Sequence, residues 1–347
     1  MRLNTLTIAV TNEYDPEYNI AGPRETLRLT MEQVRSLVDQ AAALGVSLLT
    51  FSGGEPFLLG KTLEQMVTYA AFRIPRVRVV TDCYWANTAQ DALLKVALMY
   101  QAGLSEIDIR YSDWNQSPKW IQWAKWVHLA AEQAGLTVLS HHFWDREKHG
   151  FHIAHSEAHP ADAKAAYADG LESGILTGEL HPVSLLYDNP QRGRTQDVEA
   201  LLFQRQAEGQ NCPYIFRTIT AQPDGRLSAC GGCACSAPDL NLGDWRTAAV
   251  ANLMDAGRRD PLLQWISLRG PEALRRFIDA ESPDSVPPGD YASRCHLCKD
   301  LLTTPKSRRA IRGNAGHAAQ EAIAGEIAEL KRIKGLLFNA DARPDSF

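Results

Sequence analysis

The sequence predicts an α/β fold in which β–α units form a parallel sheet, followed by a cysteine-bearing region and a helical tail. Short apolar runs of strand length alternate with amphipathic stretches of helix length as far as about residue 186. This alternation is typical of βαβ units. Six of the seven cysteines lie after position 211, so the C-terminal part is built differently from the sheet.

The first strand and the first helix carry clear local signals. Leu6, Ile8 and Val10 alternate with threonines, as in a half-buried strand, although Ala9 interrupts the polar face. Thr30 and Gln33 have the spacing of a capping box, and Gly45 suits the position just after a helix end. We therefore expect a strand near residues 5–11 and a helix between Thr30 and Gly45.

The same cycle repeats along the chain. Further strands are predicted at 46–51, 77–80, 107–110, 136–139 and 183–186, and helices at 62–72, 89–102, 118–134 and 160–172. Six strands are too few for an eight-stranded barrel, which leaves a partial barrel or an open doubly wound sheet.

The alternation ends near residues 189–194, which suggests a domain boundary close by. We expect a first domain at 1–200, a cysteine-bearing domain at 201–304 and a helical tail at 305–347. The tail opens with basic residues and continues with apolar ones at helical spacing, which is typical of a docking helix. These apolar residues are Ile323, Ile327, Leu330 and Leu337.

The composition is that of an ordinary globular protein: 45% of the residues are hydrophobic, 22% are charged, and the formal net charge is −5. No basic excess favours nucleic acid, and no apolar run reaches the roughly 20 residues of a membrane helix. The first residues lack the apolar stretch of a signal peptide. We expect a cytoplasmic protein whose cysteines are metal ligands or reactive thiols rather than disulfides.

Four cysteines have a spacing that can surround one metal centre. Two are distant from each other in sequence and two form a CxxC pair, and Pro223-Asp224-Gly225 predicts a tight turn that brings the second cysteine back toward the first. Thiolates suit zinc or an iron–sulfur cluster, and the spacing does not distinguish them. The four are Cys212, Cys230, Cys295 and Cys298.

Cys233 and Cys235 lie between these ligand candidates. They are spare ligands, a redox pair or plain buried residues, and the sequence does not choose among these roles.

A glycine-rich turn, Ser52-Gly53-Gly54-Glu55-Pro56, directly follows the second predicted strand. Ligands of open α/β sheets bind at the carboxyl ends of the strands. Here the two glycines would let a ligand approach, and Glu55 would take its amino group. A tight strand-to-helix turn is the alternative interpretation.

Polar residues also follow the other predicted strands, and we expect them at one mouth of the sheet. The candidate catalytic residues are Tyr14, Asp82, Cys83, Arg110, Asp113 and His141. A lone thiol such as Cys83 is a nucleophile, a metal ligand or a small buried residue, and burial is the favoured interpretation.

Taken together, these motifs resemble the radical S-adenosylmethionine (SAM) superfamily over about residues 5–303. The Gly-Gly-Glu-Pro turn and the segments 80–85 and 190–194 resemble stretches of its barrel. The order Cys212, Gly225, Cys230, Leu242-Gly243-Asp244, Cys295, Cys298 is similar to its SPASM/twitch extension. The resemblance implies a partial (β/α)6 barrel of radical-SAM type, a small twitch/SPASM-like domain with one auxiliary 4Fe–4S cluster on the four cysteines, and a peptide or small-molecule substrate. It also implies a SAM site at Gly53, Gly54 and Glu55.

The defining motif of that superfamily, CxxxCxxC after the first strand, is absent. Tyr14, Tyr18 and Ala21 stand at its three positions, and no cysteine precedes Cys83. SAM therefore has no iron to chelate, and we expect weak or undetectable SAM binding and no 5′-deoxyadenosyl radical.

Two functions remain. The first is an enzyme of peptide or natural-product maturation that works by non-canonical redox or metal-dependent chemistry. The second is an inactive substrate-binding or scaffold partner of an intact radical SAM enzyme.

Overall fold

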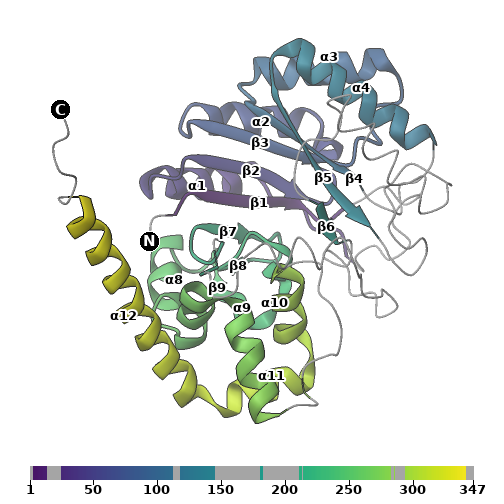
Figure 1. Ribbon diagram of the computed structural model, residues 1–347. Coiled ribbons are helices and arrows are strands. Elements are labelled where there is room, and N and C mark those ends of the chain that lie inside the picture. Colours follow the sequence, from purple (N-terminus) through teal and green to yellow (C-terminus); the bar gives the residue numbers. More distant parts are fainter. Residues whose placement is uncertain are drawn as a thin grey trace, which may run out of the picture.

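The computed structural model describes residues 3–13, 25–111, 118–144, 180–182, 211–212, 214–282, 285 and 294–340. Its centre is one nine-stranded sheet with the order β6-β5-β4-β3-β2-β1-β7-β8-β9 (Figure 1). The six strands of the first region run parallel. They are β1 (Thr5–Thr11), β2 (Leu48–Gly53), β3 (Arg76–Thr81), β4 (Glu106–Tyr111), β5 (Thr137–Trp144) and β6 (Leu180–Pro182).

Helices connect the parallel strands and cover one face of the sheet (Figure 1). The α1 capping box is present, since Thr30 Oγ1 accepts from the Gln33 N–H and the Gln33 side chain accepts from the Thr30 N–H. Gly45 has φ 69° just beyond the helix, as the sequence predicts. The helices are α1 (Met31–Ala43), α2 (Lys61–Ala71), α3 (Ala89–Gln101) and α4 (Pro118–Ala134), with a 3-10 turn, η1 (Pro56–Leu59).

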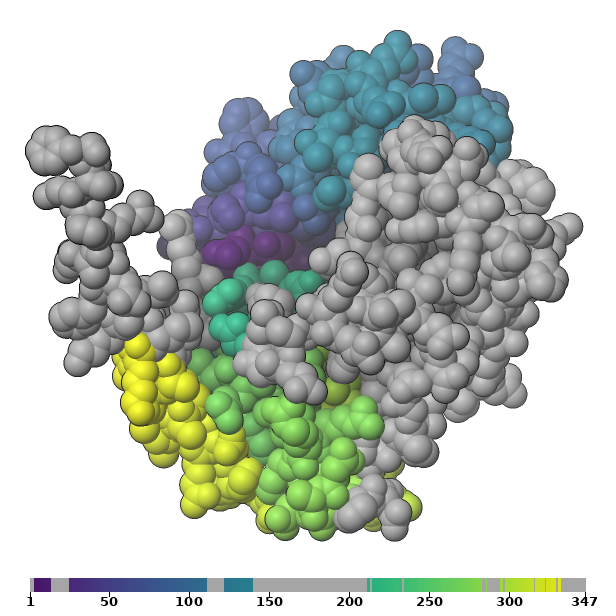
Figure 2. All heavy atoms as spheres, viewed as in Figure 1, coloured from purple at the N-terminus to yellow at the C-terminus, as the bar shows by residue number. Residues whose placement is uncertain are grey.

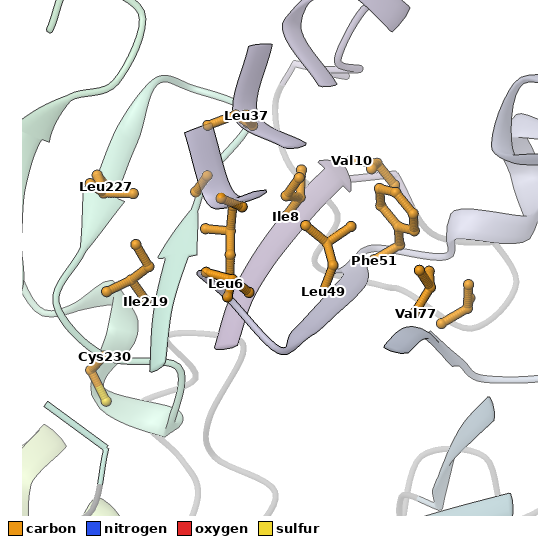
Figure 3. Packing of buried hydrophobic residues seen from close by; sticks show 14 of the residues in the cluster. Leu6, Ile8, Val10, Leu37, Leu49, Phe51, Val77, Ile219, Leu227 and Cys230 are labelled. Atoms are coloured by element: carbon orange, nitrogen blue, oxygen red, sulfur yellow. The ribbon is translucent and has the colours of Figure 1, made fainter. Parts of the chain in front are cut away.

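The two faces of the sheet differ in chemistry. Alternate residues of a strand, such as Ile107 and Ile109, are fully buried in the apolar core. Figure 3 shows the same for Leu49 and Phe51 on β2. The intervening residues are charged: Glu106 is 4% exposed and pairs with Arg78 at 2.6 Å and Arg76 at 3.1 Å. Because side chains alternate across a strand, one face packs under helices and the other carries ion pairs.

The C-terminal region extends the same sheet. β7 (Thr218–Ala221) pairs in parallel with β1, and β8 (Arg226–Ser228) and β9 (Asn241–Asp244) follow in antiparallel fashion. Two 3-10 turns, η3 (Cys233–Ser236) and η4 (Pro238–Leu240), come before β9. The helices are α8 (Val250–Gly257), α9 (Pro261–Glu281), α10 (Arg294–Thr303), α11 (Pro305–Gly313) and α12 (Ala315–Ala340).

The expected fold class, an α/β partial barrel with parallel strands, is confirmed. β6 precedes the sixth strand predicted at 183–186, and those residues lie outside the described part of the chain, as do the helix predicted at 160–172 and the boundary near 200. Among the described residues, every helix is too short or too polar to span a bilayer.

Candidate functional site

The Gly-Gly-Glu-Pro turn packs against the chain that leaves β1. The Gly54 N–H donates to Thr11 O at 2.7 Å, and the Glu55 N–H donates to Glu13 O at 2.8 Å. A Cβ on Gly54 would lie 1.9 Å from Glu13 O, and Gly53 has φ +115°. The glycines thus admit the protein's own backbone at the place where the sequence predicts a ligand.

Glu55 joins the ends of β2 and β3. Its Oε1 accepts from the Phe57 N–H at 3.0 Å, while Oε2 accepts from Thr81 Oγ1 at 2.9 Å and from the Asp82 N–H at 2.7 Å. Burial raises the pKa of this carboxyl to about 7, and the charge of Asp82 adds to the effect. Both carboxylate oxygens already accept hydrogen bonds, so the buried Glu55 side chain links the ends of β2 and β3.

Arg110 and Asp82 form a bidentate ion pair. Arg110 Nε and Nη2 lie 3.0 Å from the two Asp82 carboxylate oxygens. The same guanidinium donates to Gly53 O at 3.3 Å and to Gly54 O at 2.8 Å. Burial raises the pKa of Asp82, and the positive charge of Arg110 opposes that rise. The structure therefore brings Glu55, Asp82 and Arg110 together at one edge of the sheet.

Cys83 is fully buried beside this network, in a left-handed backbone conformation with φ 64°. Its N–H donates to Thr81 Oγ1 at 3.0 Å, and Trp85 Nε1 donates to the same oxygen at 2.7 Å. Burial raises the thiol pKa well above its usual value, and Glu55 and Asp82 raise it further. The thiol is therefore protonated at neutral pH, which disfavours a nucleophilic role in this conformation.

The structure describes only some of the other residues that the sequence predicts at the mouth of the sheet. His141 stands opposite Arg110 in the β4–β5 pairing. Tyr14, Tyr18, Ala21 and Asp113 lie outside the described residues.

The four cysteines lie together in the second region. A Cβ on Gly232 would sit 3.4 Å from Cys295 Sγ and 3.5 Å from Cys230 Sγ. Burial raises the pKa of Cys212, Cys230 and Cys298, and each of these thiols is further affected by others of the set. Segments more than 80 residues apart in sequence thus converge on one group of thiols, of which Cys212, Cys230 and Cys298 are buried and Cys295 is partly exposed.

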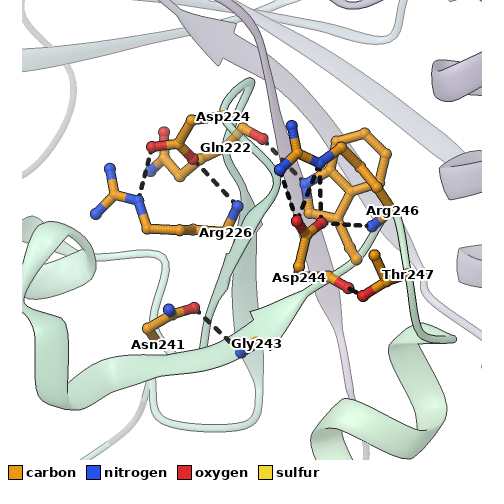
Figure 4. A network of polar contacts seen from close by, with 9 residues as sticks. Gln222, Asp224, Arg226, Asn241, Gly243, Asp244, Arg246 and Thr247 are labelled. Atoms are coloured by element: carbon orange, nitrogen blue, oxygen red, sulfur yellow. Dashed lines mark hydrogen bonds and ion pairs between the residues drawn. The ribbon is translucent and has the colours of Figure 1, made fainter.

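The Pro223-Asp224-Gly225 turn forms as predicted and returns the chain along β8 toward Cys230. The Gly225 N–H donates to Gln222 O at 3.1 Å, and Gly225 has φ +97°. A Cβ there would lie 2.2 Å from Arg246 Nε, whose guanidinium pairs with Asp244 at 2.6 Å (Figure 4).

Arg294 joins α10, which carries Cys295 and Cys298, to the segment of Cys212, and the sequence patterns do not single it out. Its Nε donates to Glu272 Oε1 on α9 at 3.0 Å, and its Nη1 donates to Asn211 O, next to Cys212, at 3.1 Å. Arg294 directly precedes Cys295. The only sequence signal was a basic residue beside the CxxC pair.

The donor set fits a 4Fe–4S cluster. It consists of four converging thiols, which are soft ligands suited to iron–sulfur centres. Among the described residues, no group of three or more His, Cys, Asp or Glu side chains has the geometry of a single-ion site. The thiols by themselves suit zinc as well as an iron–sulfur cluster.

The thiol of Cys235 is influenced by two positively charged side chains. Burial raises the pKa of its thiol to about 11, and Arg226 and Lys299 oppose the rise. The Cys233 side chain lies outside what the structure describes.

The residues after β1 do not fit a second cluster, since the chain has no cysteine before Cys83. Tyrosine and alanine at the three positions supply no thiolate.

Comparison with solved structures finds proteins with a similar α/β fold at low sequence identity. The chain matches "Native anSMEcpe with bound AdoMet and Cp18Cys peptide" with a TM-score of 0.52 and 11% identity, covering 92% of this chain and 99% of that one. It also matches Streptococcus suis SuiB bound to S-adenosylmethionine (TM-score 0.42, 11% identity, 88% and 74% covered) and BtrN in complex with AdoMet and 2-DOIA (0.39, 11%, 73% and 82%). No protein-family model and no curated protein sequence matches the chain.

Proposed function

We propose that this chain is an iron–sulfur protein of radical-SAM fold that takes part in peptide or natural-product maturation without 5′-deoxyadenosyl radical chemistry. The observation that carries the proposal is the convergence of Cys212, Cys230, Cys295 and Cys298. These residues would hold one auxiliary 4Fe–4S cluster in a twitch-like domain at 201–304, which would supply redox or substrate-binding chemistry. A reducing cytoplasm suits such thiols.

Two features of the mouth support chemistry without SAM cleavage. The region before Cys83 contains no cysteine, so nothing there chelates SAM through iron. The guanidinium of Arg110 donates to the carbonyls of Gly53 and Gly54, and Glu55 has donors at both oxygens. The part of the turn that would hold the methionine amino group is thus engaged internally.

The substrate would bind at the carboxyl ends of β1–β5, where ligands of open α/β sheets bind. Asp82 and Arg110 pair with each other there, and Tyr14, Cys83, Asp113 and His141 complete the proposed set. The substrate would be a peptide or a small molecule.

Metal content tests the first part of the proposal. After anaerobic purification, iron and acid-labile sulfide should be present at about four atoms each per chain, with an EPR signal after reduction. Replacing Cys298 with Ser should remove the colour, and Cys83→Ser is the matched control that should keep it. Stoichiometric zinc without iron would contradict the cluster.

A second candidate function is a scaffold that presents substrate to an intact radical SAM enzyme. The hydrogen bonds of Glu55, Asp82 and Arg110 favour the scaffold. Glu55 accepts from Thr81 and from the Asp82 N–H, and Arg110 donates to Asp82 and to the Gly54 carbonyl.

Incubation with SAM, dithionite and a candidate peptide, with and without an intact enzyme, separates the two candidates. The first proposal expects product from this chain with no 5′-deoxyadenosine above the no-protein control. Product that requires the second protein supports the scaffold, and 5′-deoxyadenosine from this chain alone would overturn both.

A further inference from the structure

The C-terminal helix α12 docks on α9 with one face only. His317 stacks on Phe277 with ring centroids 4.0 Å apart, and Glu321 pairs with Arg269 at 3.3 Å. Gly325 is buried, and a Cβ there would meet α9 side chains at 2.8 Å. Residues 317, 321 and 325 are four apart and therefore lie along one side of the helix.

The opposite side of α12 carries an apolar stripe, which we define as Ile323, Ile327 and Leu330. Their exposed fractions are 59%, 47% and 66%. With about 100° of rotation per residue, all three point roughly 140–200° away from Gly325 around the helix axis. Docking on α9 therefore leaves the stripe uncovered by α9, and α12 forms an outer edge of the molecule in Figure 2.

The stripe has the pattern of a two-stranded coiled coil. Its members are spaced by four and then three residues, which places Ile327 at a heptad position a and both Ile323 and Leu330 at d. A β-branched residue at a with Leu at d favours parallel dimers. The sequence continues the spacing at Lys334 and Leu337, and the helix extends to Ala340.

The charges beside the stripe are complementary to a second copy of the same helix. Glu326 precedes position a and Lys331 follows position d, and both are exposed. In a parallel in-register pair, the residue before a faces the residue five positions later on the partner helix. Glu326 of each chain would then face Lys331 of the other, twice per dimer.

We propose that α12 pairs with α12 of a second copy of this chain, in parallel and in register, through Ile323, Ile327 and Leu330. A two-fold axis along the helices places each molecule's body on the outside, because α9 contacts the far side of α12. The contact is closed and self-complementary. The stripe spans only the eight residues from Ile323 to Leu330, just over one heptad and fewer than a long coiled coil uses, so the dimer is weak and exchanges with monomer.

Sedimentation of the full chain from about 1 to 500 µM tests the proposal. We expect a concentration-dependent monomer–dimer equilibrium. Leu330→Glu should keep the chain monomeric throughout. Leu129→Glu is the matched control, since Leu129 on α4 is 61% exposed, and it should leave the equilibrium unchanged. Unaltered circular dichroism confirms that both variants fold.

Charge exchange tests the register. Glu326→Lys and Lys331→Glu should each weaken the dimer about tenfold or more, because each puts like charges opposite one another. The double exchange should restore it to within about threefold. In an antiparallel pair, Glu326 and Lys331 would face other residues, so the double exchange would not restore dimerisation. A chain that is monomeric at 500 µM, a dimer that survives Leu330→Glu, or failure of the double exchange to restore would each overturn the proposal.

Discussion

At the residue scale, the raised pKa of Glu55 makes the stability of the folded chain depend on pH. Its carboxyl is fully buried, and its pKa in the folded chain is about 7 against 4.5 in the unfolded chain. Because the folded state holds this proton more tightly, the free energy of unfolding falls as pH rises from about 4.5 to 7 and then levels off. Over this pH range the free energy of unfolding falls by roughly 3 kcal/mol.

We therefore expect Glu55→Gln to differ from the original chain most in this pH window. Glutamine cannot ionise, but its NH2 group would face N–H donors, so the variant is destabilised overall. Chemical denaturation at pH 5, 6, 7 and 8 should show a smaller loss of stability with pH in the variant than in the original chain. Parallel curves would show that another group carries the effect.

The Arg110–Asp82 pair is the second residue-scale feature. Both side chains are largely buried, and removing one partner leaves an uncompensated buried charge. Arg110→Ala should lower the free energy of unfolding by about 3 kcal/mol. The double variant with Asp82→Ala should cost less than the two single changes added together, as measured by urea unfolding in a double-mutant cycle. Additive effects would mean that the pair does not act as a unit.

At the scale of the element, the contact between the Gly-Gly-Glu-Pro turn and the chain after β1 depends on Gly54. A Cβ would lie 1.9 Å from Glu13 O and 2.8 Å from Glu13 N, and backbone atoms on that side cannot move without breaking the turn. Gly54→Ala should cost about 2 kcal/mol or more of stability. Gly316→Ala, where a Cβ meets open space, should change stability by less than about 1 kcal/mol. Thermal unfolding compares them.

Arg294 joins α10, which carries Cys295 and Cys298, to the segment of Cys212. Arg294→Ala should reduce iron bound per chain at least severalfold, because α10 and the Cys212 segment lose their common anchor. Arg294→Lys should recover part of the iron. Arg309→Ala on α11, an exposed site, is the control and should keep full iron content.

At the scale of the whole molecule, one sheet runs through both regions, since β7 pairs with β1. A metal centre in the second region should therefore stabilise the whole chain, because a ligand that binds only the folded state adds to its free energy of unfolding.

Removal of the centre tests this coupling. Cys298→Ser should lower the melting temperature by several degrees or more. Hydrogen exchange should increase most in α10 and β7–β9, and less in β2–β4. Unchanged exchange in β2–β4 would show that the centre stabilises only the second region.

Local patterns in the sequence determined most of the elements. The capping box at Thr30, the positive φ at Gly45 and the turn at Pro223–Gly225 follow from neighbouring residues, and the structure confirms them. The absence of cysteine before Cys83 is also a property of the sequence alone. Such features depend on contacts within a few residues, so the sequence carries them directly.

Tertiary structure decided what the mouth residues contact. The sequence placed Glu55, Asp82 and Arg110 at strand ends, but only the curved sheet shows that Arg110 donates to the Gly53 and Gly54 carbonyls and that Glu55 bonds to Thr81. Likewise, only the folded chain shows that Arg294 joins Glu272 to the Cys212 segment. These partners lie 22 to 83 positions apart. Because pairing at such separation is set by strand order and helix packing, no local pattern records it.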